Sequence, residues 1–348
     1  MPKRNFYIKE SEMDDFQRKV VNRRSENSLV VKGCAGSGKS VIAFWRLHDI
    51  VSNNKGSVQI IVFTKSLKNY FVEGCRGEGI DPGLIDYWYN WRRNPRTSDY
   101  ILVDEAQDFS ASDIQMFMQH ARKALLLYGD SSQQIYAFRG SKGEEPPVSM
   151  EEIQQITKYP TEQLVFNHRL PARVARVAEY VNAEGDDLEG RCKEEGTEKP
   201  YFLRCSSLEQ ELDLIAEIIR ARGYEDVGIL LPKNAQVERV VTHLRNCGLN
   251  VEAKYSKPGE TIDNLNFATS NPKVMTYHSA KGLQFGAVFL PQCEEGLLGS
   301  FLEPLYVAMT RTYQSLYILH TGDLPDVLQD VDDDLFETDY RPKETELL

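Results

Sequence analysis

Short continuous apolar runs alternate along the chain with segments whose apolar residues recur at helical spacing. In the first half, runs of the buried-strand type lie at 29–31, 58–63, 100–103 and 124–128. A helix is expected over 10–24, ahead of the first run, with Ser11 and Asp14 as a capping box. Continuous apolar strands that alternate with helices are typical of a parallel sheet covered on both faces. The pattern therefore predicts an α/β unit.

The alternation resumes after a polar, proline-containing stretch, 141–147. Strands are expected at 201–203, 227–231, 250–253, 273–277, 287–290 and 315–320. Helices are expected at 172–182, 208–222, 235–246 and 302–311. We place the start of this second α/β unit at Thr161, so the expected domains are 1–160 and 161–322, followed by a tail, 323–348.

The composition fits two domains of ordinary size. With 348 residues, 41% hydrophobic and 27% charged, the chain can bury two cores. No apolar run approaches the ~18 residues of a membrane span, and Met1–Asn5 lead into no apolar segment, so no signal peptide is expected. Six scattered cysteines without a C-x-x-C pair argue against a zinc or iron–sulfur site and suit a reducing cytoplasm.

Negative charge is concentrated in the tail. The net charge is −11, but residues 323–348 hold ten acidic and two basic residues, a net of −8, which leaves −3 for residues 1–322. A nearly neutral body is compatible with a nucleic-acid ligand, although a net acidic chain is not typical of one. We expect the tail to be solvated and flexible. A second hypothesis makes it a nucleic-acid mimic that restrains the protein.

Residues 33–40, Gly-Cys-Ala-Gly-Ser-Gly-Lys-Ser, match the phosphate-loop pattern G-x-x-x-x-G-K-[ST]. They follow a strand and precede a helical pattern, which is the context that a phosphate cradle requires. Lys39 would reach the β- and γ-phosphates, and Ser40 would hold Mg²⁺. The nucleotide would lie on Gly33, Ala35, Gly36, Ser37 and Gly38. A glycine-rich turn that matches by chance is the competing interpretation.

Acidic side chains come directly after the third strand. Strand 100–103 ends in Asp104 and Glu105, and strand 124–128 ends in the polar segment 129–140. Because ligands of open α/β sheets gather at the carboxyl ends of the strands, we expect these segments to meet the loop. Asp104 would join Ser40 as a metal ligand, and Glu105 would polarise the attacking water.

Aromatic residues and arginines interleave over 87–96. Aromatic faces stack on bases and guanidinium groups pair with phosphates, so this segment could bind single-stranded nucleic acid. A helix that buries its aromatics beside an exposed basic turn explains the pattern equally well.

Taken together, the motifs resemble those of superfamily 1 helicases of the UvrD/Rep type, in the family's order over residues 10–320. They are Gln17, GCAGSGKS, VDEAQD, GDSSQQIYAFRG, NHRL, VMTYHSAKGLQF and LYVAMTRT. The resemblance implies an α/β fold with two RecA-like (P-loop NTPase) domains, whose parallel sheets are flanked by helices. It also implies ATP and Mg²⁺ as ligands.

The resemblance assigns further roles. Gln17 would read adenine, Gln133 would sense the γ-phosphate, and Arg169 and Arg311 would reach the γ-phosphate from the second domain as arginine fingers. Phe138 falls where the family stacks a Trp on a base, with Arg139 beside it. The other expected nucleic-acid contacts are Phe63, Thr64, Thr276 and His278.

Three positions depart from the family. His168 replaces the tyrosine that stacks on adenine, Gln284 replaces the glutamate that binds ribose, and Val41 stands where an arginine is frequent. Only about 35 residues separate Lys65 from Tyr100, which leaves at most a loop for the family's first large insertion. The core's own strands and helices fill Arg169 to Lys273, which leaves no room for the second. We therefore expect a two-domain core whose phosphate contacts are conventional and whose base and sugar contacts are altered.

The resulting prediction is an ATP-dependent translocase or helicase on single-stranded nucleic acid, DNA ahead of RNA, moving 3′→5′ by resemblance. The alternative is a helicase-like ATPase switch that responds to a protein partner in a repair, replication or defence complex. Neither involves a membrane.

Overall fold

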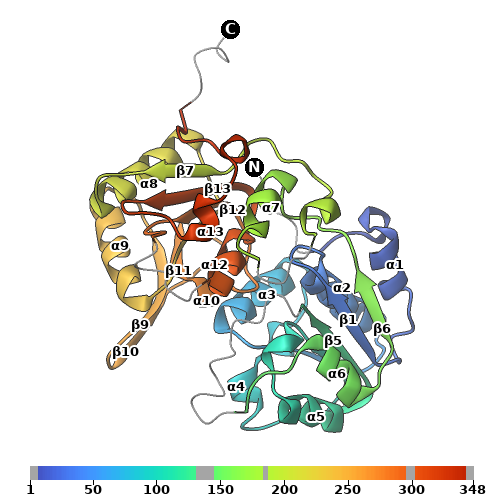
Figure 1. The fold of residues 1–348 in the computed structure, drawn as a ribbon. Helices are drawn as coiled ribbons and strands as arrows, with labels where there is room; N and C mark the ends of the chain where they lie inside the picture. The colour runs from blue at the N-terminus through green and yellow to red at the C-terminus, as the bar shows by residue number, and fades with distance from the viewer. Residues whose placement is uncertain (1–6, 131–144, 183–186, 295–301, 342–348) are drawn as a thin grey trace. The chain divides into compact units, whose positions relative to one another are not determined.

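The computed structural model describes residues 7–130, 145–182, 187–294 and 302–341 (Figure 1). The chain divides into two compact units, 2–169 and 170–348, called here the N-terminal and C-terminal units. Each is an α/β structure built on one sheet. The predicted fold class is confirmed. Among the helices within these ranges, none combines the length and apolar character needed to cross a bilayer.

The N-terminal unit contains a six-stranded parallel sheet of order β3-β2-β4-β5-β1-β6. Its strands are β1 (Leu29–Gly33), β2 (Val58–Val62), β3 (Ile85–Tyr87), β4 (Ser98–Val103), β5 (Ala121–Gly129) and β6 (Thr161–Leu164). Strand β5 separates β1 from β4, so the phosphate loop and the Asp104–Glu105 pair follow strands that are not direct neighbours. Their side chains nevertheless meet at the carboxyl edge, where Ser40 Oγ donates to Asp104 Oδ2 at 2.6 Å.

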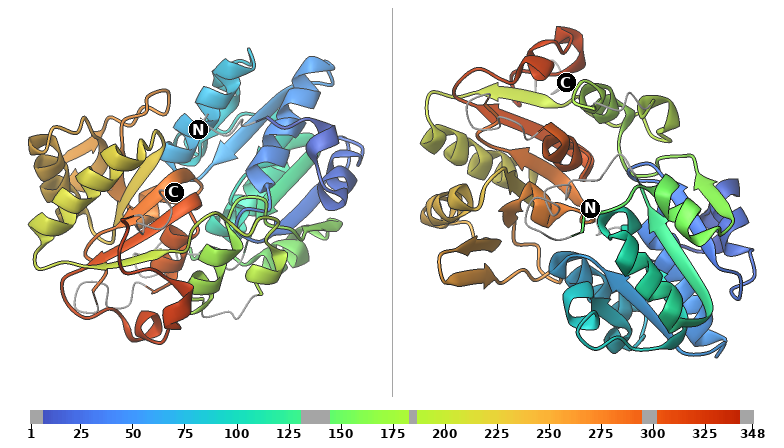
Figure 2. Two further views of the ribbon diagram at one scale, coloured as in Figure 1. Left: turned by 90° about the horizontal axis from the view of Figure 1, so that it is seen from above. Right: turned by 60° about the horizontal axis from the view of Figure 1, so that its bottom comes forward.

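Helices pack on both faces of this sheet (Figure 2). They are α1 (Asp15–Val21), α2 (Lys39–Ser52), α3 (Lys65–Gly77), α4 (Trp88–Trp91), α5 (Ala111–His120) and α6 (Met150–Thr157). The capping box of α1 lies three residues later than expected. Asp14 Oδ1 accepts from the Gln17 backbone N–H at 2.8 Å, and the Asp14 N–H donates to Gln17 Oε1 at 3.2 Å.

The C-terminal unit contains a seven-stranded sheet of order β10-β9-β11-β8-β12-β13-β7, in which only β10 is antiparallel to its neighbour. The strands are β7 (Tyr201–Arg204), β8 (Val227–Leu231), β9 (Glu252–Lys257), β10 (Glu260–Asp263), β11 (Lys273–Thr276), β12 (Phe285–Leu290) and β13 (Thr312–His320). The helices are α7 (Ala172–Glu179), α8 (Leu208–Arg222), α9 (Asn234–Asn246), α10 (Tyr277–Ala280), α12 (Leu302–Met309) and α13 (Asp326–Gln329). Helices α8 and α9 share one core with the sheet.

The chain leaves the N-terminal unit after Arg169, whereas the sequence placed the boundary after residue 160. The difference comes from β6, which pairs in parallel with β1 and extends the first sheet. Its Glu162 is buried and bonded to Lys19 at 2.8 Å and to Arg23. Partners from α1 and the turn after it therefore compensate a charge that burial would otherwise destabilise.

The acidic tail, expected to be flexible from Asp323 onward, is folded as far as Arg341. It forms α13 and a short 3₁₀ turn, and then lies along the edge strand β7. The Phe202 N–H donates to Glu337 O at 2.9 Å, and the Phe336 ring stacks on Phe202 with centroids 4.3 Å apart. This segment covers the exposed hydrogen-bonding edge of the sheet, which would otherwise invite pairing with another chain.

No inserted subdomain interrupts the described part of the first sheet. The stretch from Lys65 to Tyr100 is occupied by α3, a 3₁₀ turn, β3, α4 and the start of β4. The expectation of a core without the first large insertion agrees with this arrangement.

Replacing Phe336 with Ala should destabilise the C-terminal unit by about 1–2 kcal/mol, because a half-buried ring and its stack on Phe202 are lost. The midpoint of that unit's urea transition measures the effect. Asp333→Ala, an exposed acid in the same tail, is the control. Equal midpoints for both variants would show that the tail contributes no packing energy.

A buried carboxyl in α8 should make the C-terminal unit less stable as the pH rises. Burial raises the pKa of Glu211 to about 7, and its Oε2 accepts from the Gln292 N–H at 2.8 Å. Because the unfolded chain ionises first, stability is fully present below pH ~4.5 and is lost as the pH rises through ~7, by at most about 3 kcal/mol.

Glu211→Gln keeps the acceptor for Gln292 and removes the ionisation, so its urea midpoint should change less between pH 5 and pH 8 than that of the wild type. The exposed acid Glu217→Gln in the same helix should leave the wild-type pH dependence intact. Parallel pH profiles for wild type and Glu211→Gln would contradict the assignment.

Candidate nucleotide site

The phosphate loop joins β1 to α2 in the N-terminal unit. Gly36 and Gly38 have φ of 75° and 87°, a region that side chains with a Cβ seldom enter. A Cβ on Gly36 would lie 2.0 Å from Asn167 Oδ1, and one on Gly38 would lie 2.7 Å from Gln17 Nε2. Both glycines are therefore required by backbone conformation and by space.

Lys39 is folded back onto the loop that precedes it. Its ammonium donates to Gly33 O at 2.7 Å and to Cys34 O at 3.0 Å, and lies 3.7 Å from Asp130 Oδ2. The side chain is only 7% exposed. The carbonyls hold the charge in the cradle, where an incoming phosphate oxygen can replace them as acceptor.

Ser40 and Asp104 form the pair expected of a Mg²⁺ site. Ser40 Oγ donates to Asp104 Oδ2 at 2.6 Å, and Asp104 has no exposed surface. Asp104 Oδ1 is buried without a hydrogen-bond partner among the described residues. Burial, and then the neighbouring charge of Glu105, raise the pKa of Asp104 well above its usual range. A hard cation between these oxygens would satisfy the orphaned atom, so the residues present fit Mg²⁺.

Glu105 is held by a short chain of hydrogen bonds. It has a left-handed backbone, φ 55° and ψ 48°, which is uncommon for a residue with a side chain. Gln107 Nε2 donates to Glu105 Oε2 at 2.6 Å, while Gln107 Oε1 accepts from the Asp130 N–H at 3.0 Å. Gln107 therefore ties the carboxylate to the end of β5, where segment 131–144 begins.

On the other side of the loop, Asp14 connects two residues predicted to bind the base. Besides capping α1 at Gln17, it places Oδ2 at 2.6 Å from His168 Nε2. Gln17 is 2% exposed, and its Nε2 donates to Ser37 O at 3.1 Å. The His168 N–H donates to Gly36 O at 3.0 Å. Both residues are thus fixed to the loop as well as to each other.

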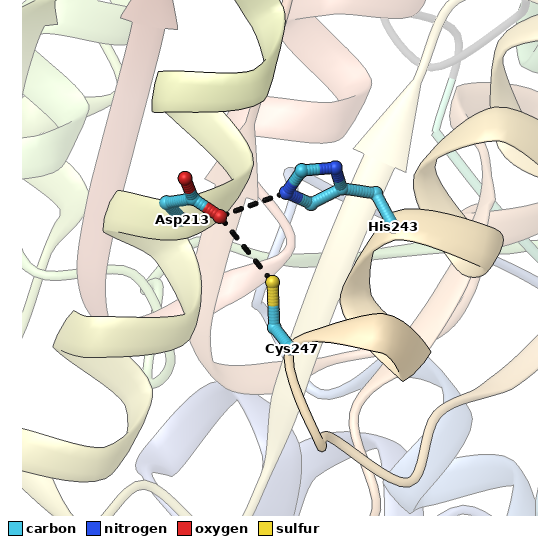
Figure 3. Close-up of side chains that lie close together, drawn as sticks. All are labelled: Asp213, His243 and Cys247. Carbon is cyan, nitrogen blue, oxygen red and sulfur yellow. Dashed lines mark hydrogen bonds and ion pairs between the residues drawn. The ribbon is translucent and has the colours of Figure 1, made fainter.

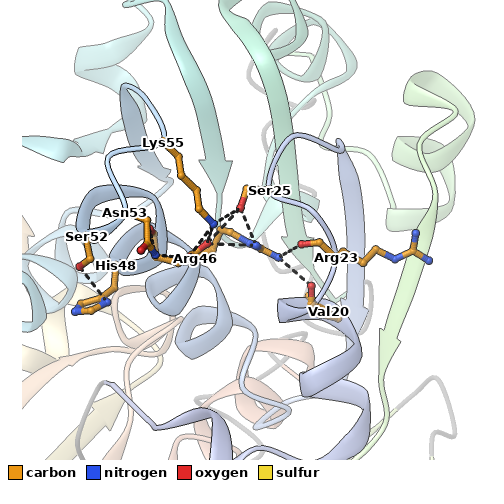
Figure 4. Close-up of polar contacts among 9 residues, drawn as sticks. Val20, Arg23, Ser25, Arg46, His48, Ser52, Asn53 and Lys55 are labelled. Carbon is orange, nitrogen blue, oxygen red and sulfur yellow. Dashed lines mark hydrogen bonds and ion pairs between the residues drawn. The ribbon is translucent and has the colours of Figure 1, made fainter.

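A buried arginine fixes α1 against α2 (Figure 4). Arg46, 2% exposed, donates to Val20 O at 2.9 Å, Arg23 O at 3.1 Å and Ser25 Oγ at 3.1 Å. Val20 O belongs to the last turn of α1 and Arg23 O to the turn just beyond it, where cationic side chains are favourable. Since α1 contains Gln17 and α2 begins at Lys39, Arg46 helps to fix the distance between these two residues.

Arg169 lies in the same unit as the phosphate loop, not in the second unit where the sequence placed it. Strand β6 returns the chain past the loop, and Asn167, fully buried, accepts from the Arg169 N–H at 3.0 Å. A Cβ on Gly36 would lie 3.1 Å from Arg169 Cβ. The backbone of this arginine is therefore anchored beside the cradle.

Two family models match the chain. The UvrD/REP helicase N-terminal domain matches residues 91–145, and the UvrD-like helicase C-terminal domain matches residues 256–322. A protein of Acanthamoeba polyphaga mimivirus, named "putative ATP-dependent DNA helicase", is 26% identical over 272 residues, which are 70% of this chain and 38% of that protein. The resemblance to UvrD/Rep-type helicases is confirmed. The chain spans less than two-fifths of the length of that relative.

Two solved structures are also similar. The Arterivirus nonstructural protein 10 helicase has a TM-score of 0.46 and 18% identity, over 86% of this chain and 61% of its own. The C-terminal domain of a possible DNA helicase from Lactobacillus plantarum WCFS1 has a TM-score of 0.39 and 16% identity, over 49% of this chain and 98% of its own.

The C-terminal unit places its UvrD-type motif residues at two edges of its sheet. Gln284 and Arg311 directly precede β12 and β13, which pair in parallel, and the Phe285 N–H donates to Arg311 O at 2.9 Å. Thr276 is the last residue of β11, at the opposite, carboxyl edge, and caps α10, which contains His278. The Arg311 side chain is 1% exposed and donates to Val307 O at 2.8 Å.

The predicted nucleic-acid contacts of the N-terminal unit have structural roles as well. Thr64 caps α3 by accepting from the Leu67 N–H at 3.1 Å. Phe63 is 6% exposed and packs edge-on against Phe109 at 5.4 Å between ring centroids. Gln133, Phe138 and Arg139 lie outside the described residues.

In segment 87–96 the two tryptophans are buried beside an exposed basic turn, as the second interpretation of this segment expects. Trp88 and Trp91 are buried, whereas Arg92 and Arg93 are exposed on the turn that follows α4. Arg92 lies over the Trp88 ring at 5.1 Å. The two tryptophans therefore build the core, and the basic turn and the partly exposed Tyr87 and Tyr89 remain available to a ligand.

Sequence reasoning missed three residues that organise the site: Asp14, Gln107 and Asn167. Each lies one to three residues from a residue that was assigned a role. Gln107 and Asn167 bond to Glu105 and Arg169 of their own motifs, whereas Asp14 reaches His168, 154 residues further along the chain.

Gly36→Ala should abolish tight nucleotide binding, with affinity falling about tenfold or more, because the added Cβ would strain the left-handed backbone and displace Asn167. Binding of a fluorescent ATP analogue measures it. Gly79→Ala is a matched control, since Gly79 has φ 68° in the same unit but nothing within 4 Å of its Cβ. Equal affinity losses in both variants would contradict the role of the Asn167 contact.

Proposed function

We propose that this chain is an ATP-driven motor that moves along single-stranded nucleic acid, with DNA as the substrate. The observation that carries the proposal is the Ser40–Asp104 pair with its orphaned buried oxygen, beside a Lys39 held inside a phosphate cradle. An ordinary glycine-rich turn requires none of these features. The relative that matches 70% of the chain is named as an ATP-dependent DNA helicase.

Phosphate binding would begin with an exchange of partners at Lys39. Its ammonium leaves Gly33 O and Cys34 O and turns to the β- and γ-phosphates, while loop N–H groups bind the remaining oxygens. Ser40 and Asp104 would hold Mg²⁺, which supplies charge stabilisation for the transferring phosphoryl group. Both residues already lie within hydrogen-bonding distance, so little rearrangement is needed.

Glu105 would orient the attacking water, and Gln107 would hold the Glu105 carboxylate in position. One amide of Gln107 contacts both the Glu105 carboxylate and the Asp130 N–H. Loss of the γ-phosphate could therefore alter the position of Asp130, which directly precedes segment 131–144. This segment contains Gln133, Phe138 and Arg139, to which the resemblance assigns contacts with the γ-phosphate and the nucleic acid. By the resemblance, Arg169 and Arg311 would complete the charge stabilisation at the γ-phosphate.

Adenine would be read by Gln17. Its amide has two N–H donors and an oxygen with two lone pairs, so the bonds to Ser37 O and from the Asp14 N–H leave capacity for the base edge. His168 would stack on the base with its ring oriented by Asp14, and Gln284 would accept from the ribose.

Thr64 and Thr276 would each contact the nucleic acid; each lies at the carboxyl end of a β-strand and caps a helix. Backbone N–H groups at such helix starts suit phosphate oxygens. Phe63, His278 and the exposed turn at Arg92 and Arg93 would add to this surface. The polarity of movement, 3′→5′, is proposed from the resemblance, and strand-displacement substrates with one 3′ or one 5′ overhang test it.

A second function, an ATPase switch regulated by a protein, is favoured by the absence of the first large insertion and by the near-neutral body. Its ATPase would respond to a protein partner. A motor should instead accelerate severalfold with single strands.

The decisive comparison is ATP hydrolysis by wild type and Glu105→Gln, each with single-stranded DNA, single-stranded RNA or neither. Wild type should be stimulated by DNA, and Glu105→Gln should bind ATP but hydrolyse it on the order of 10²-fold more slowly, because the water loses its orienting carboxylate. The exposed Glu78→Gln should behave as wild type. Hydrolysis that no nucleic acid accelerates would favour the switch.

A further inference from the structure

Three metal-ligand side chains meet on the C-terminal unit, on helices that the nucleotide chemistry does not use (Figure 3). Asp213 comes from α8, His243 from α9, and Cys247 from the residue that caps α9. His243 Nε2 lies 2.8 Å from Asp213 Oδ1, and Cys247 Sγ lies 3.3 Å from the same oxygen. All three ligand atoms lie within 4.8 Å of one another.

Helical geometry creates the arrangement. His243 and Cys247 are four residues apart, so both side chains occupy one face of α9. The Cys247 N–H donates to His243 O at 3.0 Å, which keeps the last turn regular up to the cysteine. Helices α8 and α9 contact each other and share a core with the sheet, so Asp213 is held opposite that face.

The ligand set selects the type of cation. Imidazole nitrogen, thiolate and carboxylate together are typical of Zn²⁺, whereas Mg²⁺ and Ca²⁺ prefer oxygen ligands alone. A tetrahedral Zn²⁺ with bonds of about 2.0–2.3 Å separates its ligand atoms by roughly 3.2–3.7 Å. The two separations of 2.8 and 3.3 Å from Asp213 Oδ1 reach this range with small side-chain rotations.

The metal-free bonding pattern also leaves a place for a cation. Both the thiol and the imidazole direct their donors at a single carboxylate oxygen. A zinc ion would replace these shared protons and connect all three atoms directly. Two arginines nearby already have partners: Arg239 pairs with Glu209 at 2.6 Å, and Arg220 donates to the backbone carbonyl of Cys247.

Access from solvent is open. The side chain of Asp213 is 65% exposed and that of His243 is 25% exposed. A shallow groove lined by Glu238, Arg239, Thr242, His243 and Asn246 runs along the same side of α9. Three protein ligands leave the fourth tetrahedral position to water, as in zinc sites that stay open to a further ligand.

We propose that Asp213, His243 and Cys247 form a Zn²⁺ site that ties the end of α9 to α8. The site is independent of the proposed ATPase function, because none of its ligands belongs to the nucleotide machinery.

The test is a Co²⁺ titration of the full chain after chelator treatment, because cobalt in a tetrahedral thiolate site gives visible d–d bands and a near-ultraviolet charge-transfer band. We expect one equivalent of Co²⁺ to produce both, and added Zn²⁺ to remove them. Cys247→Ser should lose the charge-transfer band, and His243→Gln and Asp213→Asn should weaken Co²⁺ binding tenfold or more.

Cys192→Ser is the matched control, since Cys192 is also a partly exposed cysteine of the same unit, and it should retain the full spectrum. Zn²⁺ should also raise the melting temperature of wild type and leave that of Cys247→Ser unchanged. A titration without a thiolate band, or a band that persists in Cys247→Ser, would overturn the proposal whatever the ATPase assays show.

Discussion

A carboxylate with no exposed surface governs the arrangement of the N-terminal unit. Asp104 lies at the end of β4, where ionisation in a low-dielectric interior is costly unless a partner compensates it. Ser40 satisfies one oxygen, and the other has no hydrogen-bond partner among the described residues. The bond to Ser40 fixes the distance between the end of β4 and the start of α2. Strand β5, which lies between β4 and β1 in the sheet, sets the spacing of the two strands. The same strand brings Asp130 close to Lys39 and Gln107.

Much of this site could be predicted from the sequence because each motif is local. The loop 33–40 contains its own glycines, its lysine and its serine, and the following carboxylates adjoin a strongly apolar strand. Strand β6 could not be predicted in the same way. Thr161–Leu164 reads as polar, and only pairing with β1 and the ion pairs of Glu162 make it part of the first sheet. Arg169 was assigned to the wrong unit for that reason.

The tail and the Asp213–His243–Cys247 cluster also depend on contacts between distant segments, which sequence patterns do not predict. Charge density over 323–348 suggested disorder, but a few apolar contacts, above all the stack of Phe336 on Phe202, decide the position of the segment as far as Arg341. The sequence contains no C-x-x-C pair, so cysteine spacing does not indicate the Asp213–His243–Cys247 cluster. His243 and Cys247 at a spacing of four were visible in the sequence, whereas Asp213, thirty residues before His243, becomes a partner only when α8 packs beside α9.

His168, which stands where the family usually has a tyrosine, is positioned by its neighbour Asp14. A histidine offers less stacking area than the tyrosine usual in the family, but His168 gains a short contact to Asp14, and Asp14 also fixes Gln17 through the helix cap. Arg46 holds the far end of the same helix. In the proposed function, recognition of the base by Gln17 and stacking by His168 would therefore be mechanically coupled through Asp14 at the start of α1. A helix displaced at either end would move both contacts together, while the phosphate contacts of the loop, which rest on β1 and α2, would stay in place.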